Sequence, residues 1–92
     1  MQVNEYFDGN VRSIGFENDE GRVTAGVMNP GEYTFNTSED ERIVVTCGSM
    51  NVRRPDAEEF ETFVAGDEFF VPAGNAFDLK IDSPVAYLCF YG

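Results

Sequence analysis

Short apolar runs separated by turn residues extend along most of the chain. Val, Ile, Phe, Tyr and Thr fill the runs, and Gly, Pro, Asn and Asp stand between them. Glycine permits positive φ, proline fixes φ, and Asn and Asp side chains hydrogen-bond within their own turns. Many short strands with turn signals at short intervals are typical of an all-β sandwich or barrel, so we predict an all-β fold.

Alternation of apolar and polar residues indicates where the strands lie. Val23, Ala25 and Val27 share one face of the first expected strand, and Tyr33 and Phe35 share one face of the second. We expect strands at Arg22–Met28, Gly31–Glu39, Ile43–Cys47, Phe60–Val64, Glu68–Val71, Phe77–Ile81 and Val85–Tyr91.

Only the segment Asp56–Ala65 also has helical spacing. Phe60, Phe63 and Val64 recur there at i, i+3 and i+4, as on one face of a helix. Phe60, Thr62 and Val64 also alternate, and the surrounding runs are all strands. We therefore predict a strand in this segment too.

Length and charge limit the possible functions. Ninety-two residues make a single domain, which we assign to residues 1–92. A chain of this length buries only roughly 60–65% of its unfolded surface, so a partner subunit would stabilise it. Six Lys and Arg against seventeen Asp and Glu give a formal net charge of −11. Phosphate backbones and anionic membrane surfaces repel such a chain, and we expect it to bind neither nucleic acid nor membranes.

The chain contains no histidine. Its absence removes the commonest metal ligand and excludes Ser/His/Asp and Cys/His nucleophilic sites within one chain. Cys47 and Cys89 form no CxxC pair, and we expect two buried free thiols. The first residues lack a basic stretch followed by an apolar run, and no apolar run approaches the ~18 residues of a membrane span. We expect a soluble, cytoplasmic protein.

Two patterns anchored by glycine stand out. In order and spacing they resemble the two motifs of the cupin superfamily, Gly-x5-His-x-His followed by Glu-x6-Gly, and Gly-x5-Pro-x-Gly-x2-His. The first runs Gly31, five residues, Thr37-x-Glu39, Glu41, six residues, Gly48, and the second runs Gly66, five residues, Pro72-x-Gly74, two residues, Phe77.

The chain departs from the cupin motifs at the metal ligands. Thr37, Glu39 and Phe77 stand where metal-binding cupins have histidine, and only Glu41 remains of the usual four ligands. Carboxylate oxygens alone suit a hard cation, but Phe77 offers it nothing. We therefore predict that the protein holds no metal.

The whole chain, from about Asn4 to Tyr91, is similar to a small cupin family, the bacterial pyrimidine/purine nucleoside phosphorylases. The resemblance implies a cupin-type jelly-roll β-barrel that is a homodimer. It also implies phosphorolysis of purine and pyrimidine ribonucleosides to ribose 1-phosphate and free base, with inorganic phosphate as co-substrate and no cofactor. It rests on Asn4-Glu5-Tyr6-Phe7, Ser13-Ile14-Gly15-Phe16, Gly26-Val27-Met28, Gly31-Glu32-Tyr33-Thr34-Phe35 and Tyr87-Leu88-Cys89.

Substrate-binding candidates follow from what phosphorolysis requires. Phosphate requires a cation, and Arg22 is our first choice because a guanidinium binds two phosphate oxygens at once. The alternative is that Arg22 pairs with a surface carboxylate. Tyr33 or Phe35 would stack on the base, or both would simply be core. Thr37 or Glu39 would hydrogen-bond the ribose hydroxyls.

Catalytic candidates are Glu41 and Glu39. In a shared confined site, one of them would have a raised pKa and would protonate the leaving base. The alternative is that both belong to an acidic turn exposed to solvent. We expect Phe77 to form an apolar cavity wall and Tyr91 to offer a hydroxyl at the cavity mouth.

Two other functions remain open from the sequence. One is a metal-free cupin that binds a small sugar or nucleoside without turnover. The other is an interaction module whose interior is filled by side chains. The fold does not decide among them, since one scaffold supports many functions. Phosphate-dependent release of base would distinguish the enzyme from the binding protein.

Overall fold

The computed structural model describes residues 1–92 and contains ten strands and no helix. Every expected strand is present, and the ambiguous segment forms a strand, so the all-β prediction is confirmed. The strands are β1 (Gln2–Tyr6), β2 (Val11–Asn18), β3 (Gly21–Met28), β4 (Gly31–Asn36), β5 (Glu41–Cys47), β6 (Ser49–Arg53), β7 (Glu61–Val64), β8 (Glu68–Val71), β9 (Ala76–Ile81) and β10 (Val85–Tyr91).

Three strands were not expected from the sequence. β1 and β2 form an antiparallel hairpin, and both mix polar with apolar residues without a strong alternation. β6 follows Gly48 directly, and its two inward residues, Met50 and Val52, are fully buried. Pairing with β2 therefore defines β1, which is largely exposed, whereas burial defines β6, and neither follows from a local pattern.

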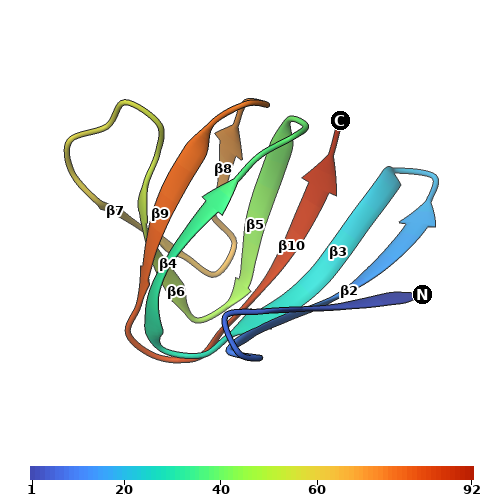
Figure 1. Ribbon diagram of the computed structural model, residues 1–92, viewed down its shortest axis with the longest axis horizontal. Helices are drawn as coiled ribbons and strands as arrows, with labels where there is room; N and C mark the ends of the chain where they lie inside the picture. Colours follow the sequence, from blue (N-terminus) through green and yellow to red (C-terminus); the bar gives the residue numbers. More distant parts are fainter.

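The ten strands form two antiparallel sheets that face each other (Figure 1). The larger has the order β1-β2-β3-β10-β5-β8, and the smaller has the order β4-β9-β6-β7. No strand of one sheet pairs with a strand of the other. The predicted all-β class thus takes the form of two facing sheets, whereas closure into a jelly-roll barrel stays a prediction.

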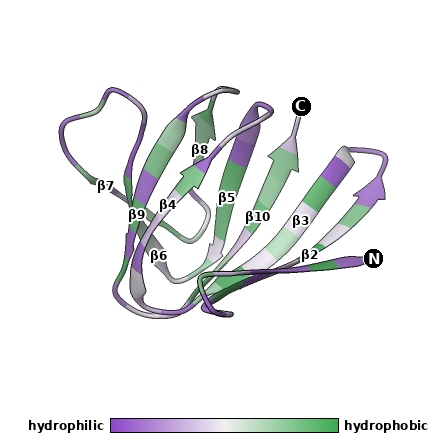
Figure 2. Ribbon diagram, viewed as in Figure 1, coloured by the Kyte–Doolittle hydropathy of each residue, from purple (hydrophilic) through white to green (hydrophobic).

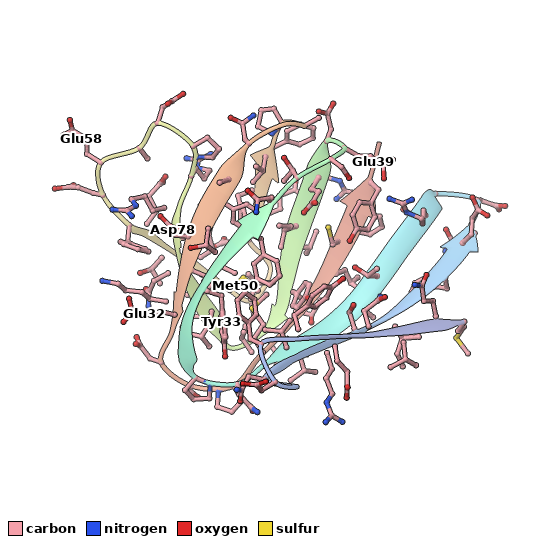
Figure 3. The ribbon with its side chains drawn as sticks, viewed as in Figure 1. Glu32, Tyr33, Glu39, Met50, Glu58 and Asp78 are labelled. Atoms are coloured by element: carbon pink, nitrogen blue, oxygen red, sulfur yellow. The ribbon has the colours of Figure 1, made fainter.

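The core lies between the sheets. Fifteen buried hydrophobic residues from both sheets form one cluster. Figure 2 shows hydrophobic residues concentrated on strands such as β5, β9 and β10, with hydrophilic residues in many of the connections. Met50 and Tyr33 are among the buried residues, and Figure 3 shows both in the interior. One end of this interior is covered by Tyr6 and Phe7, whose rings pack against those of Phe35 and Tyr33.

The inward face of β3 is not the one marked by its alternating Val and Ala residues. Thr24 and Met28 are buried and line the space between the sheets. Of the residues on the other face, Val27 is 52% exposed, and Val23 is buried outside the main core cluster. Both faces of β3 carry apolar residues, so alternation alone does not decide which face points inward. Cys47, expected to be buried, is exposed near the end of β5, while Cys89 is buried as expected.

A close packing of Tyr87 on Gly26 joins the two central strands of the larger sheet. The two residues are direct partners across β10 and β3. A Cβ added to Gly26 would lie 2.5 Å from the ring Cζ and the hydroxyl oxygen of Tyr87. Glycine is therefore required here by a neighbouring ring, although its φ is not in the left-handed region.

We expect Gly26→Ala to lower the free energy of unfolding by about 1–3 kcal/mol, because the new methyl group must displace Tyr87. Gly15→Ala is the matched control in β2, since the nearest atoms to its Cβ lie 3.8 Å away. Its effect should stay within about 0.5 kcal/mol. Urea denaturation of both variants measures the difference, and equal stabilities would contradict the packing argument.

Candidate functional site

A cavity of about 160 Å³ lies between the two sheets. Eleven of its fifteen lining residues are hydrophobic, and Glu41 is the one charged residue among them. An apolar enclosure with a few convergent polar groups is the usual form of a small-molecule site. The cavity is lined by Tyr6, Ser13, Thr24, Met28, Phe35, Asn36, Glu41, Ile43, Met50, Phe69, Phe77, Leu79, Tyr87, Cys89 and Tyr91.

Glu41 begins β5 and is half-buried. Burial raises the pKa of its carboxyl, and the nearby negative charge of Glu39 raises this pKa further. The hydrogen bond that Cys89 Sγ donates to Glu41 Oε1 (3.5 Å) and the positive charge of Arg22 act in the opposite direction. The net effect is upward, so Glu41 holds a proton more readily than an exposed glutamate does.

The groups beside Glu41 on β10 are neutral hydrogen-bonding groups. Burial raises the pKa of the Cys89 thiol to about 12 and raises the pKa values of Tyr87 and Tyr91. The hydroxyls of Tyr91 and Thr24 are within hydrogen-bond distance at 3.3 Å. Cys89 is therefore a small buried thiol rather than a nucleophile, as we expected.

Arg22 lies outside the cavity, in an adjoining groove of about 390 Å³. Thr24 and Tyr91 line both spaces and therefore separate them. The Arg22 guanidinium carbon lies 4.4 Å from the centre of the Tyr91 ring, and Arg22 forms an ion pair with Glu39. The groove is lined by Gln2, Asn4, Gly15, Phe16, Glu17, Arg22, Thr24 and Tyr91.

Four of the eight predicted site residues line the cavity. Phe35 and Phe77 stack with ring centres 5.9 Å apart and an interplanar angle of 25°. Glu41 and Tyr91 face the cavity from neighbouring positions of paired strands.

The other four predicted residues lie elsewhere. Arg22 and Glu39 form their ion pair outside the cavity. Tyr33 is buried core, and its hydroxyl donates to the Asn29 carbonyl oxygen at 2.6 Å. Thr37 is also buried, and its hydroxyl donates to the Pro72 carbonyl oxygen at 2.7 Å. Tyr33 and Phe35 thus share the core as the alternation predicts, but Tyr33 does not reach the cavity, and Thr37 and Glu39 lie beyond the end of the strand. β4 ends at Asn36, and the chain beyond it turns away to pack on the loop before β9.

Several cavity residues were not identified from the sequence. Ser13, Thr24 and Asn36 supply its other non-hydrophobic side chains, and Met50 forms part of its apolar wall. Ser13 accepts a hydrogen bond from the Asn4 side chain at 3.2 Å. A small polar residue within a strand gives no local sign that it faces a cavity, because the same residue is common on a solvated face.

No group of three or more Cys, Asp or Glu side chains is arranged so that it could hold a metal ion. No helix is long and apolar enough to cross a membrane. Metal independence and the cytoplasmic location stay predictions.

Comparison with known proteins places this architecture in a family. The family model described as pyrimidine/purine nucleoside phosphorylase matches residues 1–91. The chain belongs to this family. It is 55% identical over 91 residues to the pyrimidine/purine nucleoside phosphorylase of Photobacterium profundum, covering 99% of this chain and 98% of that one. The resemblance inferred from the sequence is thereby confirmed.

Solved structures of relatives support the fold. A protein of unknown function from Vibrio parahaemolyticus is 41% identical, with a TM-score of 0.93 over 99% of this chain and 97% of that chain. A cupin from Shewanella frigidimarina is 16% identical, with a TM-score of 0.72 over 96% of this chain and 79% of that chain. At that identity the likeness concerns the fold alone, and this chain therefore has a cupin-like all-β fold.

Because the pKa of Glu41 is raised on folding, this residue costs stability near neutral pH. The folded protein binds more protons than the unfolded chain once the pH exceeds the ordinary carboxyl pKa of 4.5, so stability falls as the pH rises through this region. We expect Glu41→Gln to raise Tm at pH 7 and to have little effect below pH 4.5.

Thermal unfolding at the two pH values measures this difference. Glu58→Gln removes the same charge from an exposed side chain and corrects for the lower net charge. An equal rise in Tm for both variants at pH 7 would contradict a raised pKa at Glu41.

Proposed function

We propose that this protein is a glycosyltransferase of the nucleoside phosphorylase type. It would cleave purine and pyrimidine ribonucleosides with inorganic phosphate, giving ribose 1-phosphate and the free base. The observation that carries the proposal is the position of Glu41, a readily protonated carboxyl in an apolar cavity beside the groove that contains Arg22. The names of its relatives support the same reaction.

The cavity suits the base. An apolar cavity of about 150 Å³ in another protein takes a single benzene ring. The cavity here has a similar volume, so it would accept the six-membered ring of either kind of base. The five-membered ring of a purine and the ribose would then extend toward the adjoining groove. Phe35 and Phe77 offer ring surfaces. Stacking on such surfaces tolerates every base, which fits a broad range of nucleosides.

Glu41 would act as the general acid. As the bond between ribose C1′ and the base nitrogen breaks, its electron pair leaves with the base, and positive charge develops on the ribosyl centre. Protonation of the departing nitrogen by Glu41 neutralises this electron pair, and a phosphate oxygen bonds to C1′. The carboxylate left on Glu41 then recovers a proton from solvent or from incoming phosphate. The Cys89 thiol, which donates to Glu41 Oε1, orients the carboxyl.

Arg22 would bind the phosphate. It is the one cation among the six Lys and Arg residues that lines the groove beside the cavity. A guanidinium binds phosphate oxygens in a bidentate geometry, and stacking on Tyr91 holds the Arg22 group in place. The proposed chemistry uses side chains alone and requires no metal or cofactor.

The second candidate is a protein that binds a nucleoside or sugar without cleaving it. The net charge of −11 opposes an anionic co-substrate, and Arg22 is already paired with Glu39. Both observations favour binding without phosphate.

We expect chelator-treated protein to release free base from uridine and from adenosine only when inorganic phosphate is present. Chromatography of the products measures the base and ribose 1-phosphate. Glu41→Gln should lower the rate about 100-fold or more, as expected for loss of a general acid, while Glu58→Gln should retain the full rate.

The other outcomes of this assay separate the alternatives. Base release without phosphate would indicate a hydrolase. No release, together with a higher Tm in the presence of nucleoside, would indicate the binding protein.

We further propose that two copies of the chain form a homodimer through the outer face of the larger sheet. Val3, Ile14 and Val27 are 66%, 44% and 52% exposed there. None of the eleven residues that line this shallow surface is acidic, in a chain with seventeen acidic residues. Two strongly negative copies repel least where no carboxylates meet, and in a two-fold dimer the same surface faces itself.

We expect the native chain to have the mass of a dimer in light scattering after size exclusion, and Val27→Glu to have the mass of a monomer. Phe70→Glu is the matched control, because Phe70 is 53% exposed on β8, outside this surface. A monomeric native chain, or dissociation by Phe70→Glu alone, would contradict this interface.

A further inference from the structure

Glu39 lies outside the cavity and directly on the proposed phosphate-binding cation. One carboxylate oxygen accepts a hydrogen bond from Arg22 Nη2, and the two side chains form an ion pair. Figure 3 shows Glu39 near the end of β10, where the chain terminates. Arg22 is held on its other side by the Tyr91 ring. In the absence of ligand, a carboxylate of the protein itself therefore occupies the guanidinium.

The loop that carries Glu39 is anchored on both sides. The Thr37 amide donates to the Asn75 carbonyl oxygen, and the Gly74 amide donates to the Thr37 carbonyl oxygen, both at 2.8 Å. The Asp40 side chain accepts a hydrogen bond from the Ala73 amide at 2.9 Å. Backbone fixed before and after Glu39 reduces the entropy lost when its side chain pairs with Arg22. The anchored loop therefore holds the backbone of Glu39 within reach of Arg22.

Carboxylate and phosphate oxygens make the same kind of hydrogen bond to a guanidinium. Glu39 and a phosphate ion would thus use the same donors of Arg22 and would exclude each other. Arg22 also has Glu17 as its direct partner across β2 and β3, yet its ion pair is with Glu39. The contact with Glu39 is thus the one that an incoming anion must replace.

We propose that Glu39 is an internal competitor for phosphate at Arg22, a positioning residue that sets phosphate affinity rather than a proton donor. This inference rests on the proposed function of Arg22. Phosphate binds only when Glu39 has released the guanidinium. The apparent affinity for phosphate therefore equals the affinity of free Arg22 multiplied by the fraction of molecules in which the Arg22–Glu39 pair is broken. The same exchange assists release of ribose 1-phosphate, because Glu39 returns to Arg22 as the anionic product leaves.

The size of the effect follows from the exposure of the pair. Exposed ion pairs contribute only modestly to stability, so molecules with and without the Arg22–Glu39 pair are both populated. The paired molecules cannot bind phosphate at Arg22, and this weakens phosphate binding about two- to sixfold. Removing the carboxylate while keeping the shape of the side chain therefore tightens phosphate binding by that factor. A residue with only a structural role would weaken binding when replaced.

The test is direct binding of inorganic phosphate, measured by titration calorimetry without nucleoside. Glu39→Gln should bind phosphate about two- to sixfold more tightly than the native chain. Arg22→Gln should abolish phosphate binding whether or not Glu39→Gln is also present, because the cation for which the two anions compete is gone. Glu58→Gln is the matched control, since Glu58 lies on the loop between β6 and β7, on the opposite side of the molecule in Figure 3.

Unchanged or weaker phosphate binding by Glu39→Gln would overturn the inference. Equal tightening by Glu58→Gln would do the same, because it would show a general effect of net charge. If no variant binds phosphate, the inference also fails. The nucleoside assay tests phosphorolysis separately. An active enzyme whose phosphate affinity is unchanged by Glu39→Gln would refute the inference and leave the proposed reaction intact.

Discussion

The register of β10 between β3 and β5 is the constraint on which the site depends. Backbone pairing places Cys89 opposite Thr24 on one side and opposite Ile43 on the other, and it places Tyr91 opposite Glu41. Three segments that are distant in sequence thereby contribute to one cavity wall. A slip of one residue would turn these side chains to the outer face.

The same strand also determines the electrostatics of the site. Its inward residues are Tyr87, Cys89 and Tyr91, which are bulky or apolar enough to remove water from Glu41 yet supply hydrogen-bonding groups. Burial is the main cause of the raised pKa of Glu41, and the hydrogen bond from Cys89 acts against it. Arg22 reaches the edge of this environment by stacking on Tyr91, which lines both the cavity that holds the acid and the groove that holds the cation.

In a strongly acidic chain, the protein's own carboxylates pair with its cations. A cation that binds an anionic ligand must therefore be able to leave its carboxylate partner. Most cations here have a carboxylate partner, as in Arg12–Glu5, Arg42–Glu68, Arg53–Asp78 and Arg54–Glu61. Arg22 is paired as well, with Glu39, but its surroundings differ from those of the other arginines. It lies in a groove that adjoins the cavity, so an anion exchanged onto it would lie close to a bound nucleoside.

The sequence by itself determined the all-β fold, seven of the ten strands and the family. It also indicated four residues that line the cavity, Glu41, Phe35, Phe77 and Tyr91, because motif spacing and alternation are local properties of the chain. The tertiary structure decided which face of each strand is covered, since alternation defines two faces without distinguishing them. It therefore placed Thr24 rather than Val27 at the cavity, moved Thr37 into a loop contact, and set Glu39 on Arg22. That last pairing joins residues seventeen positions apart through the fold of two sheets, and no local pattern contains it.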